Sequence, residues 1–145
     1  MKERLSRYNQ KFNFICEKLE KIPAKPSGLV IDATLYAVQV SIDAAMDIVA
    51  MLVKDLGEEV SDDYHNLGIL QEKKILSQKE ADILKRYNGL RNAIVHKYNK
   101  FEEKEVTEHI GEIKNNLYAF LEKVENAVKK IFAGNKEGFG KLQGI

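Results

Sequence analysis

The feature that most constrains this 145-residue chain is the spacing of its apolar residues, which recur at intervals of three and four through most of its length. No stretch shows the apolar and polar alternation that a strand requires. Both prolines lie in residues 23–26, so the remaining chain lacks the residue that most strongly breaks helices. The pattern predicts an all-α fold, a bundle of four to five helices of which two are long.

The length and composition suit one domain with one core. Hydrophobic residues make up 44% of the chain, and 145 residues are few for two separate cores. The last apolar repeat, over residues 106–131, predicts a long final helix, and several glycines follow it. We expect a single helical domain over residues 1–133 and a flexible glycine-rich tail over residues 134–145.

The first two helices are predicted on either side of the proline segment. The second, over about residues 28–56 with Ser27 as its cap, is apolar nearly all round, as in the central helix of a bundle. It is long enough to span a bilayer, but lipid would disfavour the polar stripe that crosses it. The stripe consists of Asp32, Gln39, Asp43 and Asp47. We therefore expect a buried core helix and no membrane contact.

Capping residues predict where the next two helices begin. Ser61 or Asp62 is the expected cap of a short third helix. Ser77 and Glu80 have the spacing of a capping box, in which each side chain satisfies a free backbone N–H group. A fourth helix is expected to start there and to run toward Tyr98.

The charge balance excludes a general nucleic-acid coat, because 23 Lys and Arg face 22 Asp and Glu. Residues 71–100 are an exception, with eight basic and three acidic residues. A solvated helix face and a track for RNA explain this local excess equally well.

Cysteine and histidine are too sparse to form a disulfide or a zinc site. Cys16 is the only cysteine, and the three histidines have no metal-ligand spacing. The N-terminus lacks the continuous apolar stretch of a secretory signal. These features predict a cytoplasmic protein that binds no metal.

One segment concentrates the reactive polar side chains. Arg91, Asn92, His96 and Tyr98 lie close together in an otherwise apolar helical stretch. An imidazole that titrates near neutrality can move the proton of a ribose 2′-hydroxyl, and a guanidinium can hold the phosphate. Asn92 lies one turn before His96 and can orient the imidazole. These groups suffice for RNA cleavage without a metal or a cofactor.

Helical spacing sets a geometric condition on this segment. Arg91 and His96 are five residues apart and point about 140° apart around an ideal helix, so one undistorted helix does not aim both at one phosphate. The condition is met if two copies of the helix meet about a two-fold axis, or if the helix ends near His96. Gly89 lowers helix stability by roughly 1 kcal/mol relative to alanine, which indicates a packing or access role.

The segment from Gly89 to Tyr98 resembles the signature of the HepT-like HEPN toxins, which reads Arg, Asn, three mostly apolar residues, His, any residue, Tyr. The resemblance extends to Gln39 and Asp43, which are similar to a Gln and an Asp in the family's long helix. The segment from Tyr64 to Leu70 resembles the family's short helix. In total the resemblance covers about residues 28–125.

The resemblance implies a HEPN-type helical bundle, a homodimer with a composite active site, and metal-independent cleavage of an RNA such as tRNA or mRNA. It implies that Arg91 and His96 are catalytic and Asn92 supportive. It further implies a toxin–antitoxin pair with a minimal nucleotidyltransferase antitoxin, and Tyr98 as acceptor of the AMP groups that silence the toxin. Lys97 departs from the family, in which this residue is often acidic.

Other interpretations are open. Tyr98 also fits an aromatic side chain that closes the helix, and Gln39 and Asp43 fit a buried pair that satisfy each other as well as they fit cleft support. The whole chain also fits a non-catalytic HEPN module that binds a nucleotidyltransferase partner or a nucleotide. Such a module would bind its partner and leave RNA intact.

Overall fold

Helices form every regular element of the structure, a computed structural model that describes residues 2–96 and 103–133. In chain order they are α1 (Lys2–Glu20), α2 (Leu29–Asp55), α3 (Asp63–Glu72), α4 (Gln78–His96), α5 (Lys104–Thr107) and α6 (Ile110–Ile131). No strand occurs within the described ranges. The predicted all-α class is confirmed.

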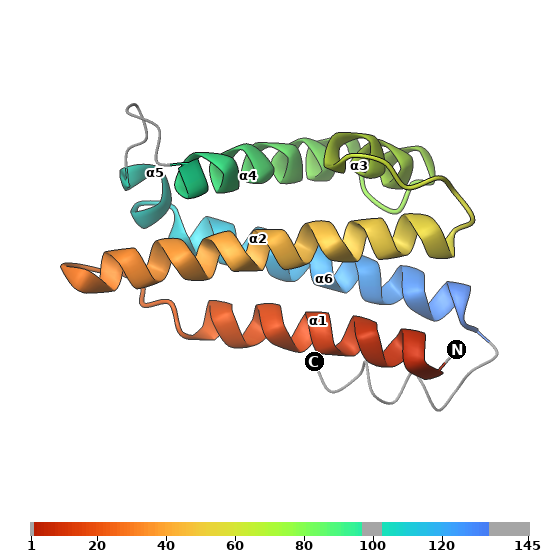
Figure 1. Cartoon of the computed structure of the whole chain (residues 1–145), viewed down its shortest axis with the longest axis horizontal. Helices are drawn as coiled ribbons and strands as arrows, with labels where there is room; N and C mark the ends of the chain where they lie inside the picture. Colours follow the sequence, from red (N-terminus) through yellow and green to blue (C-terminus); the bar gives the residue numbers. More distant parts are fainter. Residues whose placement is uncertain (1, 97–102, 134–145) are drawn as a thin grey trace.

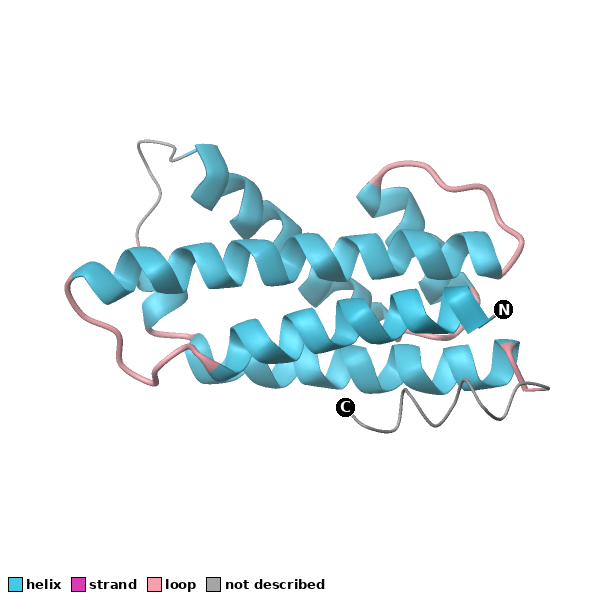
Figure 2. Cartoon of the chain, turned by 60° about the horizontal axis from the view of Figure 1, so that its bottom comes forward, coloured by secondary structure: helices cyan, strands magenta, loops and turns pink. Residues whose placement is uncertain are grey.

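The bundle is built around α2, which contacts all five other helices. Figure 1 shows α1 on one side of α2 and α3 with α4 on the other. The turned view of Figure 2 shows α1, α2 and a further long helix side by side, and α6 contacts both α1 and α2. A helix with neighbours on several sides buries residues around most of its circumference, which explains why α2 is apolar nearly all round.

By length and composition alone, α2 could cross a membrane. However, 61% of its most apolar window is buried inside the bundle. The core helix of a bundle and a membrane span share the same apolar character, and here most of the apolar window is covered by protein. The expected interpretation as a core helix accounts for the pattern.

The cap predicted at Ser27 is wrong. Gly28 is the N-cap of α2, with a φ of 59°, and no side chain caps this end. A φ in this range disfavours residues with a Cβ, so glycine suits the position. Ser27 contributes its backbone carbonyl instead, which accepts a hydrogen bond from the N–H of Val30 at 3.2 Å.

Two other predicted caps are confirmed. Asp62 caps α3 by accepting a hydrogen bond from the N–H of His65 at 2.8 Å. The Ser77 hydroxyl accepts from the N–H of Glu80 at 3.1 Å, and the Glu80 carboxylate accepts from the N–H of Ser77 at 2.8 Å. This capping box fixes where α4 begins, and hence which way each of its later side chains faces.

The long final helix predicted over residues 106–131 is divided in two. The backbone leaves helical geometry at His109, where φ is −123°, and α6 begins at Ile110. The β-branched pair Val106 and Thr107 has modest helix propensity, and Gly111 has less. The break lets α5 pack on α2 while α6 packs on both α1 and α2.

A polar cluster joins the beginning of α1 to the end of α2. The Asp55 carboxylate accepts hydrogen bonds from Arg4 Nε at 2.8 Å and from the Tyr8 hydroxyl at 2.7 Å. The Tyr8 side chain is fully buried. Burial, followed by the hydrogen bond to Asp55, raises the pKa of Tyr8 far above its usual range.

Some of the predictions concern residues that the structure does not describe. Lys97 and Tyr98 lie outside the described residues, and so does the predicted tail over residues 134–145. The single domain over residues 1–133 stays a prediction.

Candidate functional site

Arg91 lies on the side of α4 that faces α2. The buried residues Leu84, Tyr87 and Ile94 hold α4 against the rest of the bundle. In this orientation Arg91 Nε donates a hydrogen bond to Oδ1 of Asp43 on α2. The two side chains are 30% and 40% exposed, so this ion pair lies at the rim of the bundle, where a solute can reach it.

The polar stripe of α2 connects it to the helices on both sides. Asp43 pairs with Arg91 of α4, and Asp47, one turn later, accepts a hydrogen bond from Lys11 of α1 at 2.9 Å. Gln39 is half-buried one turn before Asp43. The geometry therefore places Asp43 beside the motif, with Arg91 as its partner.

Asn92 holds the same guanidinium from the neighbouring position. Its Oδ1 accepts a hydrogen bond from Arg91 Nη1 at 2.9 Å. Two nitrogens of the guanidinium are thus fixed by acceptors from two different helices, which restricts how the planar group can turn. The sequence also predicted that Asn92 orients His96, and this role stays a prediction.

His96 is exposed and is the last residue of α4 within the described residues. Residues 97–102 lie outside the description, so a helix end near His96 stays a prediction. The other expected solution to the angular problem, a two-fold axis, concerns a second copy of the chain and also stays a prediction.

Gly89 does not serve a close contact within the described chain. A Cβ built at this position meets no atom of another described residue within 4 Å. The packing role that the sequence left open is therefore not filled by the described residues, and the access role is the one that the geometry favours. Such an open helical face allows a substrate or a second protein to approach the backbone.

The basic residues between positions 71 and 100 are partly neutralised. Lys73 pairs with Glu58 at 3.0 Å, Arg86 approaches Glu112 at 3.8 Å, and Arg91 pairs with Asp43. An RNA strand that followed this surface would compete with carboxylates for these cations. The local charge excess is therefore weaker in the folded chain than in the sequence.

Together, the described motif residues combine a positioned cation with an exposed imidazole. Arg91 can hold an anionic group if that group replaces or joins Asp43, and the imidazole of His96 can take part in proton transfer. Within residues 2–96 and 103–133, no three His, Cys, Asp or Glu side chains lie together as metal ligands. The chemistry available to these residues is anion binding coupled to proton transfer.

Comparison with known proteins agrees with this arrangement. A family model described as Ribonuclease HepT-like matches residues 6–124. Two proteins of Archaeoglobus fulgidus are each named "Putative RNase". One is 41% identical over 88% of this chain and 98% of its own length. The other is 42% identical over 68% of this chain and 74% of its own length.

A protein of Methanocaldococcus jannaschii, also named as a "Putative RNase", is 53% identical over 46% of this chain and 76% of its own length. No solved structure matches the chain significantly.

Proposed function

This chain belongs to the HepT-like ribonuclease family, and we propose that it is a metal-independent endoribonuclease toxin in which Arg91, Asn92 and His96 cleave RNA. The observation that carries the proposal is the double anchoring of Arg91 by Asp43 and Asn92, five residues before the exposed His96. A guanidinium held in this way is prepared to bind a phosphodiester, and a nearby imidazole can handle the proton.

In the proposed reaction, His96 takes the proton of the ribose 2′-hydroxyl, and the 2′-oxygen attacks the adjacent phosphorus. The bond to the 5′-oxygen breaks, and this oxygen takes a proton from an imidazolium or from water. Arg91 stabilises the charge on the phosphoryl oxygens. The products are a 2′,3′-cyclic phosphate and a 5′-hydroxyl, and DNA is spared because it lacks the 2′-hydroxyl.

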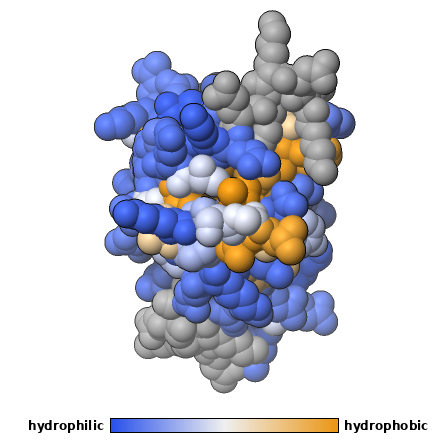
Figure 3. All heavy atoms as spheres, turned by 90° about the vertical axis from the view of Figure 1, so that its left-hand side faces the viewer, coloured by the Kyte–Doolittle hydropathy of each residue, from blue (hydrophilic) through white to orange (hydrophobic). Residues whose placement is uncertain are grey.

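We further propose that two copies form the active cleft. The support comes from exposed apolar side chains at the motif end of the bundle: Leu29 is 88% exposed, Tyr36 58% and Val95 37%. Figure 3 shows apolar atoms gathered at the end of the molecule where α2 begins. Association through this end would cover apolar surface and bring a second Arg91 and His96 to the cleft.

Regulation is proposed from the family resemblance. Tyr98 follows His96 by two residues, so an AMP group on its hydroxyl would add bulk and negative charge near the phosphate-binding Arg91. A minimal nucleotidyltransferase antitoxin is the proposed partner that adds it, and both proteins would act in the cytoplasm. The added charge would repel RNA and silence the toxin.

The proposal is tested with purified protein, shown by mass to carry no AMP, incubated with total RNA and with tRNA in excess EDTA. Wild type is expected to leave 2′,3′-cyclic phosphate ends or their 3′-phosphate products, and His96→Ala to leave the RNA intact. Equal cleavage by both proteins would reject the role of His96. Binding of a nucleotidyltransferase without any RNA cleavage would favour the non-catalytic module instead.

A further inference from the structure

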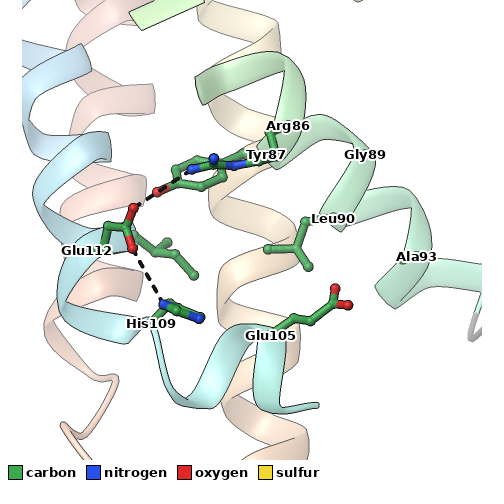
Figure 4. A pocket seen from close by; sticks show the side chains of 9 residues that line it. Arg86, Tyr87, Gly89, Leu90, Ala93, Glu105, His109 and Glu112 are labelled. Carbon is green, nitrogen blue, oxygen red and sulfur yellow. Dashed lines mark ion pairs between the residues drawn. The ribbon is translucent and has the colours of Figure 1, made fainter. Parts of the chain in front are cut away.

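A pocket of about 430 Å³ opens between α4, α5 and α6 (Figure 4). Its floor is apolar and includes Tyr87, Leu90 and Ile113, while Gly89 and Ala93 form the wall contributed by α4. The volume falls within the range of roughly 300–1,000 Å³ that is usual for small-ligand sites. The pocket is therefore large enough for a planar ring system.

The pocket adjoins the face of α4 that carries Asn92 and His96. Gly89, Ala93 and His96 recur at intervals of four and three residues, so they follow one side of the helix. At 1.5 Å of rise per residue, Ala93 and His96 are only about 4.5 Å apart along the helix axis. A group seated against Ala93 is one helical turn from the imidazole.

The rim of the pocket carries a guanidinium, an imidazole and carboxylates. The guanidinium of Arg86 lies over the ring of Tyr87, 6.0 Å from its centroid. Glu112 is 3.8 Å from Arg86 and 3.5 Å from His109, and these three side chains form a network along one edge (Figure 4). Flat guanidinium and imidazole groups are the surfaces on which splayed RNA bases stack.

Glu105 completes the rim from α5. Its side chain is exposed and has no hydrogen bond or ion pair to any residue in the described parts of the chain. Figure 4 shows it directed across the pocket toward the side of Leu90 and Ala93. The Glu105 carboxylate can therefore accept a hydrogen bond from a ligand. Together with Glu112 it places negative charge on the rim, which disfavours a phosphate in the pocket.

We propose, on the basis of the proposed ribonuclease function, that this pocket binds the base of a nucleotide next to the scissile phosphate. The apolar floor would contact the ring, Arg86 or His109 would stack on it, and Glu105 would accept a hydrogen bond from an exocyclic amine. Adenine, cytosine and guanine carry such an amine and uracil does not. Glu105 would thus make the enzyme discriminate against uracil at one position beside the cut.

The test is cleavage of a randomised single-stranded RNA library, with sequencing of the cut ends. With wild type, uracil is expected to be depleted about fivefold at one position flanking the cut, which corresponds to the lower end of discrimination by hydrogen bonds to a base. Glu105→Ala is expected to remove this depletion while cleavage continues. Glu108→Ala is the matched control, because Glu108 is exposed, adjoins the same short helix and does not line the pocket.

Cleavage without any base preference, or a preference that survives in Glu105→Ala, would overturn the base pocket and leave the ribonuclease function intact. If wild type does not cleave at all, the ribonuclease proposal fails, and the pocket is then tested by binding. The same library would be selected on His96→Ala by filter retention. Depletion of uracil in the RNA retained by His96→Ala, lost when Glu105→Ala is added, would support the base pocket. Retained RNA without depletion of uracil would reject the base pocket.

Discussion

Asp43 is a positioning residue for the proposed chemistry, because its carboxylate aims the Arg91 guanidinium. We expect Asp43→Ala to lower kcat about 10- to 100-fold, since hydrogen bonds to charged groups contribute roughly 1.5–3 kcal/mol and the unanchored guanidinium would lose its direction. The measurement is steady-state cleavage of a defined oligoribonucleotide.

Asp47→Ala provides the control for this prediction. Asp47 lies on the same stripe of α2 one turn later, and its partner is Lys11 rather than Arg91. It should leave kcat close to that of wild type. An unchanged kcat in Asp43→Ala, or equal losses in both variants, would mean that Asp43 does not position Arg91 in the working enzyme.

Gly89 offers a second prediction at this scale, in which stability and activity move in opposite directions. Gly89→Ala is expected to raise the free energy of unfolding by about 1 kcal/mol, because alanine favours the helix and its Cβ meets no described atom. The methyl group would narrow the open face of α4, so kcat/KM for RNA should fall. Urea unfolding and cleavage assays measure the two effects.

The matched control is Gly68→Ala on α3, where an added Cβ also meets nothing within 4 Å among the described residues. It should stabilise the fold similarly and leave cleavage unchanged. Loss of stability in Gly89→Ala would show that the position makes a contact in the native protein after all.

Residue partners were the hardest feature to predict from the sequence. The chain indicated that Asp43 was either cleft support or the partner of Gln39, and it indicated no partner for Asp47. Any exposed carboxylate on one helix can pair with several cations on its neighbours. Only the packing of α2 between α1 and α4 assigns Arg91 to one carboxylate and Lys11 to the other.

At the scale of elements, the contact between α1 and α2 should show a defined pH dependence. Tyr8 has a raised pKa in the folded state, so the folded protein keeps the phenolic proton when the unfolded chain loses it near pH 10. The stabilisation that comes from the raised pKa of Tyr8 is complete below pH 10 and is lost as the pH rises above that value. The expected slope is a loss of up to about 1.4 kcal/mol in unfolding free energy per pH unit.

Tyr8→Phe isolates this effect from those of the other tyrosines. The variant should be about 1 kcal/mol less stable at pH 7, because the hydrogen bond to Asp55 is lost. Above pH 10 its unfolding free energy should fall less steeply than that of wild type, and denaturant unfolding across this range checks the difference. Parallel curves for the two proteins would contradict the assignment to Tyr8.

Helix starts were predictable where side-chain chemistry defines them. Asp62 and the Ser77–Glu80 box act locally, and their caps form as the spacing indicated. The cap at Gly28 and the break at His109 were missed, because they depend on a backbone conformation and on where neighbouring helices lie. Periodicity alone does not distinguish one continuous helix from two successive helices whose apolar residues follow the same spacing.

For the whole molecule, the proposed dimer makes a prediction about complementation. Arg91→Ala and His96→Ala are each expected to be inactive alone. If each cleft takes Arg91 from one protomer and His96 from its partner, mixing the variants through unfolding and refolding restores one intact site in each heterodimer. Random pairing would then return roughly a quarter of wild-type activity.

The control is a mixture of either single variant with the double variant, which should stay inactive because no cleft then contains both groups. Sedimentation measurements on the same samples would establish that the chains associate. Heterodimers that form without regaining activity would place Arg91 and His96 of one site on a single chain.

The central place of α2 also has a consequence for the order in which the chain folds. Of its neighbours, α1 and α3 adjoin it in chain order and α4 follows α3, so much of the bundle forms between helices that are close in chain order, which favours rapid folding. During synthesis α1 and α2 can pair before α4 has left the ribosome. The carboxylate that receives Arg91 would then already be in place when the motif helix emerges and docks.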